Sequence, residues 1–113
     1  EVLRQLAERM EQSIREIDIV CRWGGEEFLF LLPGTQLAEA YRIIQRVHER
    51  ITEKPVELDP QPVAITMTFG IAAVDSEIDA AIERADMAMY QGKDAGRNRI
   101  IVDADQASER PDP

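Results

Sequence analysis

Residues 22–30 read RWGGEEFLF, and LLPGT follows at residues 31–35. Glycine accepts the positive φ angles of tight hairpin turns, so Gly24 and Gly25 predict a turn between two short strands at residues 18–23 and 27–32. Acidic residues are depleted in strands, and a turn needs only the glycines. The hairpin alone therefore does not account for the adjacent carboxylates of Glu26 and Glu27.

Helical patterns of apolar residues stand on both sides of the hairpin. Residues 1–17 are predicted to form one helix and residues 36–51 another, with Thr35 in the capping position of the second. The apolar positions are Val2, Leu3, Leu6, Ala7, Met10, Ile14 and Ile17 in the first helix, and Leu37, Ala40, Tyr41, Ile44, Val47 and Ile51 in the second. Each helix therefore presents one apolar face that another element has to cover.

The C-terminal half alternates strand and helix. A short edge strand is expected at residues 56–58, a β-rich segment at 63–74 and a last strand at 99–102. Between the last two lies a helix whose apolar and capping positions are Ile78, Ile82, Ala85 and Met89, Ser76 with Asp79 at its start, and Gly92 as its stop. The order α-β-β-α-β-α-β predicts an α+β fold, with one antiparallel sheet flanked by helices.

Composition limits the classes of function. The chain has 113 residues, 44 % of them hydrophobic, so one packed domain is expected, followed by a disordered tail at residues 103–113. A net charge of −9 argues against DNA or RNA as a partner, because nucleic-acid binding needs a surplus of cations. The longest apolar run, residues 28–32, is too short to span a membrane. The single cysteine, Cys21, fits the cytoplasm, including the cytoplasmic domain of a larger sensor protein.

Glu26 and Glu27 suggest a metal site if the backbone bends at the turn. Neighbours in a regular strand point to opposite faces, so both carboxylates reach one ligand only where the turn distorts the backbone at Glu26. Gly24 and Gly25 permit such a distortion and let a ligand approach the main chain. Two carboxylates with a phosphate ligand suit Mg²⁺. The alternative is an exposed turn whose acids are solvated.

RWGGEEF followed by LFLLPGT resembles the signature hairpin of the GGDEF family, the diguanylate cyclases, in its GGEEF form. The resemblance continues through FGIA at residues 69–72 and ADMAMYQGKDAGRNRI at residues 85–100. Agreement of several separated blocks in the right order makes the resemblance specific. It implies that residues 1–102 are part of a GGDEF domain, with the palm-like fold of the nucleotidyl cyclases and its ferredoxin-like core.

The resemblance also implies an enzyme activity. Diguanylate cyclases condense two GTP molecules into cyclic di-GMP, a bacterial second messenger, and the competent unit is a homodimer in which each domain holds one GTP. The glutamates matching Glu26 and Glu27 serve two Mg²⁺ (or Mn²⁺) ions, and the one matching Glu26 is linked to deprotonation of the attacking hydroxyl. The glycines matching Gly24 and Gly25 lie against the nucleotide. In such two-metal sites one cation favours the alkoxide and the other steadies the leaving pyrophosphate.

A basic turn, KDAGRN at residues 93–98, follows the third helix. Bases near a helix C-terminus complement its dipole and need no ligand. In the resembled family, the residues matching Lys93 and Arg97 bind the phosphates of GTP. Both interpretations stay open on the sequence.

A second arginine cluster precedes the hairpin. Arg15 and Asp18 form an R-x-x-D motif, which in many diguanylate cyclases marks a product-inhibition site for cyclic di-GMP. Arg42 and Arg46, one helical turn apart, match the helper arginines of that site. Arginine suits guanine and phosphate because its planar fork donates two parallel hydrogen bonds. The alternative is an ordinary surface network of charges.

The resemblance begins inside the family's domain. The implied missing part would supply a central strand, an aspartate that binds both metals, and the residues that recognise guanine. The segment alone is therefore expected to be inactive, even if its parent protein is a cyclase. Its unpaired strand edges predict self-association or strand exchange, or else an N-terminal part that was cut off or numbered out of this chain. The competing functions are a non-catalytic signalling module that binds cyclic di-GMP and a purely structural dimerisation domain.

Overall fold

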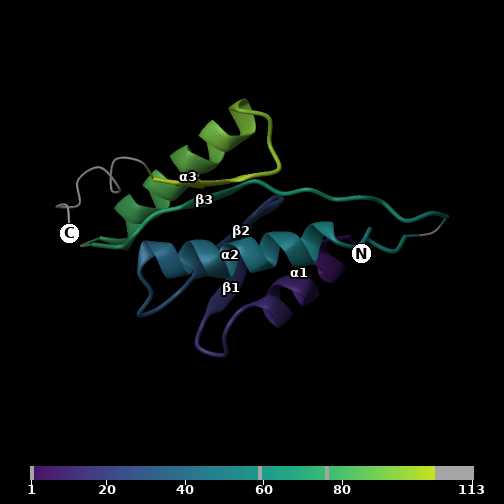
Figure 1. The fold of residues 1–113 in the computed structure, drawn as a ribbon, viewed down its shortest axis with the longest axis horizontal. Helices are drawn as coiled ribbons and strands as arrows, with labels where there is room; N and C mark the ends of the chain where they lie inside the picture. The colour runs from purple at the N-terminus through teal and green to yellow at the C-terminus, as the bar shows by residue number, and fades with distance from the viewer. Residues whose placement is uncertain (1, 59, 76, 104–113) are drawn as a thin grey trace. The chain divides into compact units, whose positions relative to one another are not determined.

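The computed structural model describes residues 2–58, 60–75 and 77–103. In chain order, Figure 1 shows α1 (Val2–Ser13), β1 (Ile19–Gly24), β2 (Glu27–Leu31), α2 (Leu37–Thr52), β3 (Phe69–Ile71), α3 (Ile78–Asp94) and β4 (Ile100–Val102). The expected order of elements and the α+β class are confirmed. Of the expected tail, only Asp103 lies within the described residues.

Two compact units make up the chain, and α2 contributes to both. The first unit comprises Glu1–Thr35 and Gln45–Thr66, and the second comprises Gln36–Ile44 and Met67–Pro113. The first unit therefore contains the glycine hairpin and the R-x-x-D motif, and the second contains the basic turn.

In the first unit, two arginines link α1 to the C-terminal half of α2. Arg9 donates from Nη1 to the carbonyls of Ile51 (3.0 Å) and Lys54 (2.6 Å), where α2 ends. Arg46 of α2 donates from Nε to the carbonyl of Ser13 (3.0 Å), where α1 ends. The last carbonyls of a helix have no partner within the helix and carry partial negative charge, so a guanidinium suits them. Each helix is thus capped by an arginine of the other.

The first helix is shorter than its apolar pattern predicts. It ends at Ser13 rather than at residue 17, and the Ser13 hydroxyl donates back to the carbonyl of Arg9 (2.6 Å). A tight turn follows, in which the N–H of Asp18 donates to the carbonyl of Arg15 (3.0 Å). Ile17 is consequently 61 % exposed instead of buried on a helix face. The largest fully buried side chains of this unit include those of Met10, Val47, Ile51 and Val56.

The second unit holds a parallel pair of strands. Phe69, Gly70 and Ile71 of β3 pair with Ile100, Ile101 and Val102 of β4, while β1 and β2 form a separate antiparallel pair. The expected antiparallel pairing is therefore confirmed for β1 and β2, but the expectation that all strands form one antiparallel sheet is wrong. A helix joins β3 to β4, and a helical crossover returns the chain in the same direction, whereas a tight turn reverses it. The β-rich pattern at residues 63–74 yields a strand only at Phe69–Ile71, and that at 56–58 only a bridge between Val56 and Val63.

Two glycines allow α3 to approach its neighbours closely. A Cβ on Gly70 would lie 1.9 Å from the Ala85 carbonyl oxygen and 2.5 Å from the Met89 nitrogen, so the β3 backbone rests directly on α3. A Cβ on Gly92 would lie 2.7 Å from Cγ2 of Thr68. Gly92 is therefore a packing position inside α3, and the expectation that it ends the helix is wrong.

The start of α3 differs from the expected capping pair. Glu77 occupies the N-cap position with extended backbone angles, and within the described part of the chain its side chain makes no capping hydrogen bond. Ser76, the expected partner of Asp79, lies outside the described residues.

Candidate functional site

The glycine hairpin departs from regular pairing at its tip. Arg22 pairs with Phe28, but the next pair is Gly24 with Glu27, so Trp23 is an extra residue that forms a bulge. Gly25 turns the chain with a φ of +53°. Glu26 lies in the turn and Glu27 begins β2. The distortion falls at Trp23 and Gly25, and it leaves Glu26 outside the strand ladder, where the alternation of neighbouring side chains does not apply.

An arginine that the sequence interpretation did not single out braces this turn. Nε of Arg22 donates to the carbonyl of Gly25 (2.8 Å), from β1 across to the turn. Among the described residues, a Cβ placed on Gly24 or Gly25 would meet nothing within 4 Å. The turn therefore offers bare backbone to open space, and a ligand can approach it.

The two glutamates at the turn suit a metal that binds together with a phosphate. Glu26 is exposed and Glu27 is half-buried. The described residues contain no group of three or more His, Cys, Asp or Glu that could hold a metal on its own. Mg²⁺ commonly takes one or two carboxylates and completes its octahedron with substrate phosphate and water. The pair Glu26 and Glu27 fits that mode of binding.

The basic turn ends α3 in a Schellman motif. The N–H of Arg97 donates to the carbonyl of Gly92 (2.9 Å), and that of Gly96 to the carbonyl of Lys93 (3.3 Å). Gly96, with a φ of +124°, is therefore the residue that ends the helix. The turn brings Lys93 and Arg97 to the same end of α3.

Arg97 and Asn98 continue the turn in a left-handed conformation, with φ angles of 64° and 50°. Such angles cost a non-glycine residue of order 1 kcal/mol and occur often at ligand sites. The N–H of Asn98 donates to the Thr68 hydroxyl (3.1 Å), which anchors the turn to the segment before β3. Lys93 is half-buried, with Nζ 5.0 Å from the centre of the Tyr90 ring, and Arg97 is exposed.

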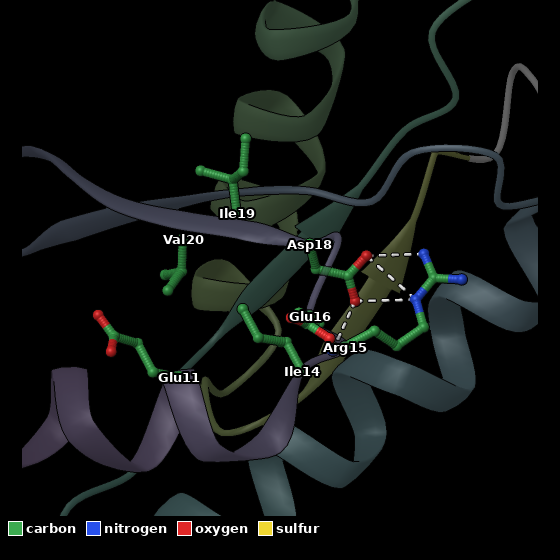
Figure 2. A pocket seen from close by; sticks show the side chains of 7 residues that line it. All are labelled: Glu11, Ile14, Arg15, Glu16, Asp18, Ile19 and Val20. Atoms are coloured by element: carbon green, nitrogen blue, oxygen red, sulfur yellow. Dashed lines mark hydrogen bonds and ion pairs between the residues drawn. The ribbon is translucent and has the colours of Figure 1, made fainter.

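Arg15 and Asp18 form a closed ion pair, shown in Figure 2. Nε of Arg15 lies 3.1 Å and 2.9 Å from the two Asp18 carboxylate oxygens, and Nη2 lies 2.7 Å from Oδ1. The backbone N–H of Arg15 also donates to Oδ2 (2.8 Å). Both oxygens of Asp18 are thus engaged by one residue.

Burial and charge set the ionisation of this pair. The Asp18 side chain is 0 % exposed and that of Arg15 is 30 % exposed. Hydrogen bonding from the Arg15 side chain holds the pKa of Asp18 below its ordinary value of 3.8, against the opposing effect of burial, and Arg46 adds a smaller attraction. The first unit thus brings Arg15, Asp18 and Arg46 together. Arg42 lies one helical turn before Arg46 on α2, is exposed, and belongs to the second unit.

The loop between β2 and α2 also holds Arg15. Nη2 donates to the Thr35 hydroxyl (2.6 Å) and to the carbonyl of Pro33 (3.1 Å). The first turn of α2 is closed by a bond from Ala40 N–H to the Gln36 carbonyl (2.8 Å), so the capping position is Gln36 and the expectation for Thr35 is wrong. The Thr35 hydroxyl instead donates a hydrogen bond to the Pro33 carbonyl (2.9 Å) and accepts one from Nη2 of Arg15.

A cavity of about 340 Å³ lies beside the ion pair. Figure 2 shows it between the end of α1 and the start of β1. Its lining is formed by Glu11, Ile14, Arg15, Glu16, Asp18, Ile19 and Val20. The lining combines apolar side chains with the Arg15–Asp18 pair, and its other two charged residues, Glu11 and Glu16, are acidic.

Comparison with known proteins identifies the family. A family model described as "Diguanylate cyclase, GGDEF domain" matches residues 1–99. The response regulator PleD of Caulobacter vibrioides is 39 % identical in an alignment of 106 positions that covers 89 % of this chain and 23 % of PleD. Diguanylate cyclase DgcP of Pseudomonas aeruginosa is 37 % identical in an alignment of 103 positions that covers 89 % of this chain and 15 % of that protein. The chain thus spans less than a quarter of these curated relatives.

Solved structures agree in fold. Diguanylate cyclase SiaD of Pseudomonas aeruginosa, in complex with its activator SiaC, superposes with a TM-score of 0.83 at 33 % identity, covering 89 % of this chain and 40 % of SiaD. The active GGEEF domain of a diguanylate cyclase from Vibrio cholerae gives 0.75 at 28 % identity, covering 90 % of this chain and 66 % of that one. Among the described residues, none of the helices combines the length and apolar character needed to cross a membrane.

Proposed function

The chain belongs to the GGDEF domain family of diguanylate cyclases, and from this premise we propose that its whole protein condenses two GTP molecules into cyclic di-GMP. The observation that carries the proposal is the glycine turn. Its backbone faces open space at Gly24 and Gly25, and two carboxylates stand directly beside it. A solvated turn would need neither the glutamates nor the bulge and arginine brace that shape the tip.

Each residue of the hairpin has a role in this proposal. Gly24 and Gly25 admit the nucleotide against the main chain, and Glu26 and Glu27 hold two Mg²⁺ or Mn²⁺ ions together with phosphate oxygens. When bound, the ions stabilise the negative charge of the attacking 3′-oxygen and of the leaving pyrophosphate. Glu26, in the turn and exposed, is the residue that assists removal of the hydroxyl proton.

Lys93 and Arg97 bind the triphosphate in this proposal. Both stand at one end of α3, on a turn that the Schellman motif and the bond to Thr68 hold in place. Fixed cations suit a phosphate ligand in a chain whose net charge is −9, because the positive charge has to be local. Two such domains, each with one GTP, face one another in a homodimer in the cytoplasm.

Product inhibition is the second part of the proposal. Arg15, Asp18, Arg42 and Arg46 bind cyclic di-GMP, through the planar forks of the arginines and the Asp18 carboxylate. The intact cluster of Arg15, Asp18 and Arg46 in the first unit also supports a second candidate, a non-catalytic module that binds cyclic di-GMP as a signal.

Two measurements on the full-length protein separate these candidates. Incubation with GTP and Mg²⁺, followed by mass spectrometry, is expected to reveal cyclic di-GMP and pyrophosphate. Calorimetric titration with cyclic di-GMP is expected to show binding in either case. Binding without synthesis would favour the signalling module and overturn the cyclase proposal.

A further inference from the structure

The closed ion pair has a consequence for ligand binding that rests on the proposed inhibitory site. Asp18 has no exposed side-chain surface, and both of its oxygens accept hydrogen bonds from Arg15. A carboxylate in that state has no surface to offer a ligand. If Arg15 and Asp18 both contact cyclic di-GMP, the pair has to open first.

The contacts from the loop between β2 and α2 resist that opening. Nη2 of Arg15 is shared between Asp18, the Thr35 hydroxyl and the Pro33 carbonyl. Swinging the guanidinium away from Asp18 therefore breaks the contacts to the loop as well. Thr35 is itself fixed, because its hydroxyl donates to the Pro33 carbonyl.

We propose that Thr35 is a latch that holds the Arg15–Asp18 pair closed and so weakens the binding of cyclic di-GMP. A ligand that binds only the open state has an apparent affinity reduced by the fraction of molecules that are open. The latch lowers this fraction without touching the ligand, so Thr35 sets the product concentration at which inhibition begins. It is a positioning residue that acts through Arg15.

The hydrogen bond from Arg15 to the Thr35 hydroxyl can be removed by substituting Thr35. Pro33 contributes only its backbone carbonyl, and Asp18 belongs to the proposed binding site. Thr35→Val keeps the shape of the side chain and deletes the hydroxyl, whereas Thr35→Ser keeps the hydroxyl. Thr52 of α2 supplies a matched control, because its hydroxyl donates to the carbonyl of His48 (3.0 Å) within the helix.

The test is surface plasmon resonance with cyclic di-GMP on full-length wild type and on the Thr35→Val, Thr35→Ser, Thr52→Val and Arg15→Ala variants. A hydrogen bond to a charged group at a half-exposed position predicts roughly five- to tenfold tighter binding for Thr35→Val. The gain is expected in the association rate constant, with the dissociation rate constant unchanged, because the latch is broken in the bound state. Thr35→Ser and Thr52→Val should bind like wild type, and Arg15→Ala should not bind.

The outcomes separate the latch from the site on which it rests. Suppose that wild type binds cyclic di-GMP, that Arg15→Ala does not, and that Thr35→Val binds no more tightly than wild type. The proposed site would then stand and the latch would be overturned. Failure of wild type, Thr35→Val and Thr35→Ala alike to bind would remove the inhibitory site and the latch together. Thr35→Ala deletes the same hydroxyl and carries the same prediction if Thr35→Val does not fold, which circular dichroism would show.

Discussion

Arg15→Ala leaves the Asp18 carboxylate buried with one remaining hydrogen bond, from the backbone N–H of residue 15. Removing one partner of a buried ion pair costs about 3–5 kcal/mol, because the other charge stays unpaired. Arg15 is itself 30 % exposed, so its charge is partly screened and the lower end of the range applies. We expect the free energy of unfolding at neutral pH to fall by about 3 kcal/mol.

Asp18→Asn is expected to cost less, about 1–2 kcal/mol, because the amide oxygen still accepts from Arg15 and the remaining cation reaches solvent. The double variant Arg15→Ala with Asp18→Asn has no buried charge. It is therefore expected to be more stable than Arg15→Ala alone, by about 1 kcal/mol. Urea unfolding, monitored by circular dichroism, gives the free energy of unfolding of wild type, the two single variants and the double variant.

The pH dependence gives a second readout of the same pair. The pKa of Asp18 is lowered in the folded state, so its contribution is fully present above its ordinary value of 3.8 and is lost as the pH falls through the folded-state pKa. The difference in free energy of unfolding between wild type and Arg15→Ala should therefore become smaller as the pH falls from neutral to below 3.8. A difference that does not change with pH, or a double variant less stable than Arg15→Ala, would refute the electrostatic explanation.

Two further predictions concern the second unit. Gly70→Ala would place a methyl group 1.9 Å from the Ala85 carbonyl oxygen, so it should lower the free energy of unfolding in urea by more than about 3 kcal/mol. The control Gly24→Ala meets nothing within 4 Å among the described residues and should lower it by less than about 1 kcal/mol. Equal losses would contradict the close packing of β3 on α3. Arg97→Gly relieves a φ of +64° and should therefore raise the free energy of unfolding by about 0.5–1 kcal/mol. The same variant should bind GTP more weakly in calorimetry, because it lacks the guanidinium. An unchanged GTP affinity would remove Arg97 from the proposed phosphate site.

Local signals in the sequence were enough to predict the order of helices and strands and the position of the hairpin turn. Gly24 and Gly25 identified the turn, and the apolar spacing of α2 identified its buried face, with Leu37, Ile44, Val47 and Ile51 all buried as expected. Tyr41 is the exception, at 37 % exposed, because it lies at the edge of that face. The possible metal site at Glu26 and Glu27 followed from the residues themselves, whereas the phosphate role of the basic turn and the inhibitory role of the R-x-x-D motif came from the resemblance to the family.

Long-range contacts were not accessible to the same reasoning. Gly92 looks like a helix stop in the sequence because nothing local indicates that Thr68 packs against it. The caps by Arg9 and Arg46 join residues more than 30 positions apart, and the bond from Arg15 to Thr35 joins residues 20 apart. The direction of β4 depended on the helical crossover, which alternation along a strand does not encode.

The most direct test of the central claim is the initial rate of cyclic di-GMP formation from GTP and Mg²⁺ by full-length wild type, Glu26→Gln and Glu53→Gln. Glu53 is an exposed glutamate of the same unit and serves as the matched control. We expect Glu53→Gln to work at the wild-type rate and Glu26→Gln to be inactive with an unchanged circular dichroism spectrum. Wild-type turnover by Glu26→Gln would contradict the assignment of the acidic hairpin to catalysis.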